Sequence, residues 1–137
     1  YKTEQETKRQ DAAVAAAKAN SSLVRLQGSP KQVAWAETLR ASGIEAIRNI
    51  IVQIPETESE ELRAALATAA KRVSNVTSAT WWIDRRNHGM FTGRWTYQNL
   101  SLFFAFGTIN PGKDHPLINA SKSDAFAAIS NYKPDLT

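Results

Sequence analysis

Large apolar side chains recur at helical spacing through the second quarter of the chain. Most steps between them are three or four residues, as one stripe of a long helix requires; the stripe consists of Trp35, Leu39, Ile47, Ile50, Ile51 and Ile54. Ser29 is suited to the N-cap and Pro30 to the first turn, while Pro55 ends the pattern. We therefore expect one long helix, which Ser42-Gly43 would kink or split in the middle.

A second amphipathic segment follows at once. Thr57-Glu58-Ser59-Glu60 matches a capping box. The apolar positions after it are Leu62, Ala65, Leu66, Ala69 and Val73. Because several of them are alanines, we expect this helix to pack closely against a neighbour. Ser78 can then cap a further helix that carries Trp81-Trp82 and stops at Asn87-His88-Gly89.

The aromatic run at residues 95–106 has two interpretations. Leu100, Leu102, Phe104 and Phe106 alternate as in a strand, whereas Leu100, Phe103 and Phe104 fit a helix that opens at Thr96 and ends at Gly107. We favour the helix, because a lone strand has no partner elsewhere in the sequence. A loop is expected at 90–94, a turn at 108–116, and a last helix capped at Ser123-Asp124. The fold class predicted is an all-α, small multi-helix bundle, with α+β containing a short strand or hairpin around 95–106 as the alternative.

The N-terminal segment differs from the rest of the chain. Residues 3–20 are rich in Ala, Glu, Gln and Lys but carry almost no large apolar side chain. We expect a peripheral helix there, frayed or packed against a partner or a second copy, which would make a homo-oligomer. With no linker long enough to divide the chain, residues 1–137 are predicted to form a single domain.

Composition excludes several classes of protein. The chain has 137 residues, of which 42% are hydrophobic and 22% charged, as in globular proteins. It has no cysteine, which excludes disulfides, thiolate zinc sites and cysteine nucleophiles. No apolar run approaches the roughly 20 residues of a membrane helix, and the N-terminus does not resemble a signal peptide. We therefore expect a cytoplasmic protein that has no membrane partner.

Positive charge and aromatic surface coincide at one place. The net charge is +4, and residues 77–94 hold Arg85, Arg86 and Arg94 against Asp84 alone. Arg85 and Arg86 directly follow the tryptophan pair. Phosphate neutralisation and stacking on aromatic rings are how many proteins bind nucleic acid, so this segment favours a binding function.

Two segments carry a resemblance to a known kind of module. Residues 28–40 read GSPKQVAWAETLR and residues 79–87 read ATWWIDRRN. Together they resemble a poorly characterised module of phage, plasmid and conjugative-element proteins, in which a GSxKQxxWAxx[IL]R helix start precedes a W-I-D-x-R segment. The resemblance covers about residues 26–87 and implies helical structure and a mobile-element setting, without an established activity. Some members carry zinc ribbons, but without cysteines this chain gives no reason to infer a metal.

Helical geometry divides the roles of these residues. Adjacent helical side chains point about 100° apart, so Trp81 and Trp82 should not both be buried against one flat neighbour. Arg85 would stack over Trp81, and Arg86 over Trp82. The predicted binding residues are Trp82, Arg85, Arg86, Arg40, Lys31 and Arg94. The predicted structural residues are Trp35, Leu39, Trp81, Ile83 and Asp84, the last pairing with Arg40, Lys31 or Arg85. The plainer interpretation is that both tryptophans of the pair are structural.

Catalytic signals are weak. His88 could form an acid–base pair with Asp84, but a histidine at a helix end is usually a surface residue. The chain has two histidines, no phosphate-binding glycine loop and no nucleophile elbow. We therefore expect a protein that is not an enzyme and has no cofactor. The predicted function is a mobile-element accessory protein that binds nucleic acid through a basic and aromatic helix face. The alternative is a protein-binding inhibitor or adaptor of a host nucleic-acid-handling or defence protein.

Overall fold

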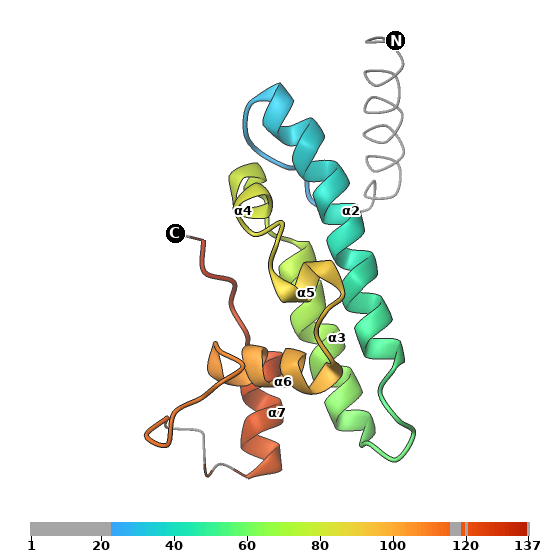
Figure 1. Cartoon of the computed structure of the whole chain (residues 1–137), viewed down its shortest axis with the longest axis vertical. Coiled ribbons are helices and arrows are strands. Elements are labelled where there is room, and N and C mark those ends of the chain that lie inside the picture. The colour runs from blue at the N-terminus through green and yellow to red at the C-terminus, as the bar shows by residue number, and fades with distance from the viewer. Residues whose placement is uncertain (1–22, 116–118, 120, 137) are drawn as a thin grey trace.

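The structure is a computed structural model that describes residues 23–115, 119 and 121–136. This part of the chain forms a helical bundle without a strand, as the all-α prediction required (Figure 1). Its helices are α2 (Pro30–Val52), α3 (Glu60–Ser74), α4 (Ala79–Asp84), α5 (Gly89–Thr92), α6 (Tyr97–Phe106) and α7 (Lys122–Ser130). The alternative of a strand or hairpin around 95–106 is wrong, since α6 occupies this stretch. The helix predicted at residues 3–20 lies outside the described residues.

The long helix α2 begins as its sequence predicts and continues without a break. Ser29 Oγ accepts from the Gln32 N–H at 3.2 Å, and the Gln32 side chain accepts from the Ser29 N–H at 3.1 Å. The helix runs through Gly43 without splitting there. A Cβ added at Gly43 would lie 2.8 Å from Phe91 Cδ1 and 3.2 Å from Trp82 Cζ3. The glycine therefore allows Phe91 of α5 and Trp82 of α4 to pack closely against α2.

The helix α3 begins two residues later than the predicted cap. Ser59, not Thr57, is the N-cap, and its Oγ accepts from the Leu62 N–H at 3.2 Å. Glu58, which the predicted cap placed in the first turn, instead accepts from the Tyr97 hydroxyl at 3.3 Å. The apolar face is as predicted, because each of its five members is buried: Leu62, Ala65, Leu66, Ala69 and Val73. This face lets α3 pack against α2, α6 and α7.

Two short helices replace the predicted fourth helix. α4 ends at Asp84, and His88 caps α5 because its Nδ1 accepts from the Met90 N–H at 3.3 Å. Gly89 therefore begins a helix where a stop and a loop were predicted. The start of α4 is held by the backbone of the connector, residues 23–29. The Gln27 N–H donates to the Thr77 carbonyl at 2.7 Å, and the Gln27 carbonyl accepts from the Ala79 N–H at 2.9 Å.

The C-terminal helices close the other end of the bundle. α6 opens with a capping box between Thr96 and Asn99 and ends at Gly107 (φ 78°), as predicted. α7 is capped by Ser121, two residues before the predicted cap. The chain then runs back toward α4 (Figure 1), where the Asp135 carbonyl accepts from two donors of α4 and its C-cap. Buried side chains from each described helix meet in one core.

Candidate binding surface

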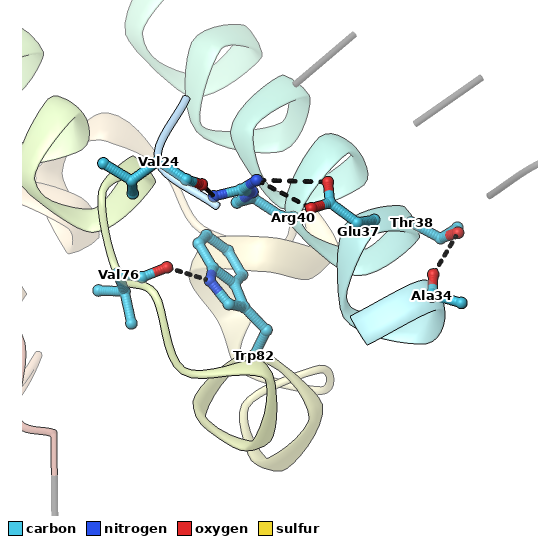
Figure 2. Close-up of polar contacts among 7 residues, drawn as sticks. All are labelled: Val24, Ala34, Glu37, Thr38, Arg40, Val76 and Trp82. Atoms are coloured by element: carbon cyan, nitrogen blue, oxygen red, sulfur yellow. Dashed lines mark hydrogen bonds and ion pairs between the residues drawn. The ribbon is translucent and has the colours of Figure 1, made fainter. Parts of the chain in front are cut away.

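Both tryptophans of the adjacent pair are buried. Trp81 is 3% exposed and Trp82 is 1% exposed, so the prediction that Trp82 faces a ligand is wrong. The Trp82 Nε1 donates to the Val76 carbonyl at 3.0 Å (Figure 2), while the Trp81 Nε1 donates to the Asp135 carbonyl at 2.7 Å. Two adjacent helical side chains can both be buried here because α4 has more than one flat neighbour. The pair is instead enclosed from several sides, by α2, by Phe91 of α5 and by the returning C-terminal segment.

Arg40 is also buried, at 1% exposure, and cannot be a ligand contact. Figure 2 shows its guanidinium between the connector and α2: Nη1 donates to the Val24 carbonyl at 2.7 Å, and Nη2 pairs with Glu37 at 3.1 Å. The predicted pairing of Asp84 with Arg40, Lys31 or Arg85 is not found. Asp84 is exposed, and among the described residues the ion pairs are Arg40–Glu37, Arg48–Glu45 and Arg63–Glu60. Arg40 thus fastens the connector to α2.

Arg85 stacks as predicted, but it is engaged in structure. Its Cζ lies 4.6 Å from the centroid of the Trp81 ring. Its Nη2 donates to the Asp135 carbonyl at 3.1 Å, and its Nη1 donates to the Trp81 carbonyl at 3.4 Å. Because the guanidinium closes the C-terminal segment over Trp81, Arg85 is a half-buried structural residue and is no longer a good candidate for phosphate binding.

Trp35 has the exposure that was expected of Trp82. The prediction placed Trp35 in the core, yet its exposed fraction is 48%. The buried positions of α2 are Ala36, Arg40, Gly43, Ile47 and Ile50. These buried positions recur at steps of four and three residues. At the start of the helix they are Ala36 and Arg40, each one residue after the predicted Trp35 and Leu39. Leu39 and Ile83 are partly buried against the core, as expected of structural residues.

Two basic side chains accompany the exposed indole. The Cζ of Arg86 lies 5.3 Å from the centroid of the Trp35 ring, so Arg86 stacks on Trp35 and not on Trp82. Its Nη1 donates to the Ile83 carbonyl at 2.7 Å, which fixes the guanidinium in place. Lys31 is exposed one helical turn before Trp35, a spacing that makes them neighbours on the helix surface. We call Lys31, Trp35 and Arg86 the Trp35 patch.

Arg94 is exposed but lies elsewhere. It follows Gly93, which shares a shallow hollow with Asn49 and Gln53 of α2 and its C-cap. Asn49 is fourteen residues beyond Trp35 on one helix, which is about 20 Å at 1.5 Å per residue. The predicted set of binding residues is therefore divided. Lys31 lies one helical turn from Trp35 and Arg86 stacks on it, Arg94 follows the hollow at Gly93, and Trp82, Arg40 and Arg85 support the fold.

His88 is built into an aromatic cluster. Its ring centroid lies 4.8 Å from that of Trp95 and 4.9 Å from that of Phe103. Burial lowers the pKa of His88 below its ordinary value of 6.5, and the charge of Arg85 lowers it further. The Nδ1 that an acid–base pair with Asp84 could use is occupied in capping α5. Within the described residues, no group of three or more His, Asp or Glu side chains is placed to hold a metal ion.

A second surface feature lies between α2 and α3. It is an open hollow of about 490 Å³, mainly lined by apolar side chains that include Leu23, Ile44, Ile51 and Ala70, with Arg48 at its edge. Val52, at the end of α2, is 72% exposed beside it. None of the described helices has the length and apolar content that a bilayer crossing needs.

Comparisons with protein-family models, with characterised proteins and with solved structures find no match to this chain. The resemblance of residues 26–87 to mobile-element modules therefore stays a prediction, and the Trp35 patch and the α2–α3 hollow are the surfaces from which a function has to be argued.

Proposed function

We propose that this chain is a non-enzymatic accessory protein of a mobile element and that it binds nucleic acid through the Trp35 patch. The observation that carries the proposal is an indole that is 48% exposed, with a guanidinium held 5.3 Å from its centroid. A large aromatic ring normally lies in the core, where its burial stabilises the fold. One that stays half open beside fixed positive charge is suited to accept a base on its surface and a phosphate at its edge.

The charges of the patch set the expected strength of binding. Lys31 and Arg86 are both exposed and can each neutralise a phosphate. Two phosphate contacts predict that the logarithm of the binding constant falls with the logarithm of salt with a slope of about −1.4 to −1.8. This is a small electrostatic contribution, so we expect weak binding at physiological salt and a clear increase in affinity at low salt.

Fluorescence anisotropy with a labelled oligonucleotide tests the proposal. Binding is measured from 25 to 200 mM salt for the wild type and for Trp35→Ala, Lys31→Ala and Arg86→Ala. The matched control is Arg48→Ala, which removes an exposed arginine of the same helix, at a distance from the patch. We expect all three patch variants to bind more weakly and the control to bind as the wild type does. Equal loss in the control and in the patch variants would contradict the proposal.

The α2–α3 hollow supports the second candidate function, a protein-binding inhibitor or adaptor. An apolar depression beside the exposed Val52 is the kind of surface on which an amphipathic partner helix can lie. The variant Ile44→Glu places a charge in the hollow, away from the Trp35 patch. If this variant loses a protein partner that Trp35→Ala retains, the adaptor function is supported; if both variants retain it, the hollow is not its binding site.

A further inference from the structure

We propose that the Trp35 patch selects single-stranded nucleic acid and that an unpaired base stacks on the Trp35 ring. This inference rests on the proposed function and specifies its ligand. In a duplex both faces of each base are covered by the neighbouring pairs, so an indole on the protein surface has no base face to contact. A single strand exposes its base faces, and stacking on an aromatic side chain is the usual way in which such strands are held.

The indole is held ready for stacking. Arg86 packs at 5.3 Å from the ring centroid, and the bond from its Nη1 to the Ile83 carbonyl at 2.7 Å limits its movement. Since Ile83 belongs to α4 and Trp35 to α2, the packing of the two helices sets this geometry. The arrangement leaves about half of the tryptophan side chain accessible, which a base can cover without a rearrangement of the fold.

Beyond Lys31 and Arg86, the residues of α2 next to Trp35 add no side chain that is free to read a duplex groove. Direct readout needs donors and acceptors that reach base edges. Ala34 precedes Trp35 and has no polar side-chain group, and the hydroxyl of Thr38, three residues after it, donates to the Ala34 carbonyl at 3.5 Å. Ala34 and Thr38 therefore add no free hydrogen-bonding side chain to the two cations and the ring of the patch.

The charge near Trp35 is also too sparse for a duplex. Duplex DNA carries one negative charge per roughly 1.7 Å of its axis, and proteins that bind it tightly contact many phosphates. Around Trp35 the structure places Lys31 and Arg86, with the exposed carboxylate of Asp84 two residues before Arg86. The arginines that could have extended the patch, Arg40 and Arg85, are fixed in the fold. Two cations and one ring match a short stretch of single strand.

The test compares three probes with the intact chain at low salt: oligodeoxythymidine of twelve nucleotides, an abasic strand of the same length, and a duplex of twelve base pairs. We expect the thymidine strand to bind more tightly than either of the others. Trp35→Leu should weaken its binding by roughly 5- to 150-fold, the range known for loss of one stacked base. Trp35→Phe, which keeps a ring, should lose less, and neither variant should change binding of the abasic strand.

The possible outcomes separate this inference from the proposed function. Equal or tighter binding of the duplex, lost in the patch variants, overturns single-strand selection and leaves nucleic-acid binding through the patch intact. Loss of abasic binding in Trp35→Leu equal to the loss of thymidine binding overturns base stacking. If none of the probes binds at low salt, both proposals fail. Because Trp35 is half exposed, we expect Trp35→Leu to have the same free energy of unfolding in urea as the wild type. This control excludes unfolding as the cause of weaker binding.

Discussion

Replacing Gly43 by alanine is expected to destabilise the fold, although alanine favours a helix more than glycine does. The two effects have opposite signs. In the interior of a helix the replacement of glycine by alanine contributes about 0.8–1.0 kcal/mol of stability. Gly43 lies in the middle of α2, where this gain applies in full. A stabilised variant would be the result if helix propensity alone decided the outcome.

The packing around Gly43 opposes this gain. An added Cβ would lie 2.8 Å from Phe91 Cδ1, closer than carbon atoms approach in folded proteins, and 3.2 Å from Cζ3 of the buried Trp82. Neither contact is with the end of a flexible side chain, so α4 or α5 has to shift. Inserting a methyl group into a packed core costs about 1–3 kcal/mol. The difference is a net loss of about 1 kcal/mol in the free energy of unfolding.

Urea unfolding followed by circular dichroism measures this loss. Ser42→Ala is the matched control, because Ser42 is the exposed neighbour in the same helix and its replacement changes helix propensity alone. We expect the control to gain a few tenths of a kcal/mol while Gly43→Ala loses stability. Phe91→Leu should cost less in the Gly43→Ala background than in the wild type. A gain of about 1 kcal/mol in Gly43→Ala would refute the packing of α4 and α5 described here.

Other variants test the polar contacts and the caps. Arg40→Met should lower the free energy of unfolding by about 3–5 kcal/mol in urea, because it leaves the buried contacts to Val24 and Glu37 without their donor; a loss below 1 kcal/mol would contradict this role. Ser59→Ala should cost about 1 kcal/mol and Thr57→Ala close to none, and the reverse order would restore the cap predicted from sequence. The pKa of His88 is lowered by burial and by Arg85, so the neutral ring stabilises the fold above pH 6.5 and this stability is lost as the pH falls through the folded-state pKa. Unfolding at pH 7.5 and pH 5 should show this loss in the wild type, and it should be smaller in His88→Asn, which keeps a capping acceptor without titrating.

The fold class follows from patterns that lie within one element. Ser29 with Pro30 places the start of α2 correctly, and Thr96 with Gly107 places both ends of α6, because a cap is a contact between residues a few positions apart. The buried face of α3 was predicted for the same reason, since its five apolar positions recur at the spacing of one face of a helix. The cap of α3 was placed two residues early because Thr57 and Ser59 are both good capping residues and the capping-box pattern favours Thr57, whereas the helix uses Ser59.

The candidate site could be predicted only in part. The size of the side chains predicts a stripe of α2 that includes Trp35 in the core. The helix instead buries Ala36 and Gly43, because small residues let α4 and α5 come close. This one-residue change of face exposes Trp35. Arg86 and Lys31 were identified from charge, but the ring that joins them was assigned to the wrong tryptophan.

The six residues of α4 are too few to form a stable helix alone, since the first turn of a helix costs more than it returns. α4 is held at its start by Gln27, about fifty residues earlier in the chain, and at Trp81 by Asp135, 54 residues later. Closing loops of that length is entropically costly and comes late in folding. The stacked geometry of Trp35 and Arg86 therefore belongs to the completed fold. During synthesis on the ribosome, we expect the chain to acquire this surface only after its C-terminal segment has emerged.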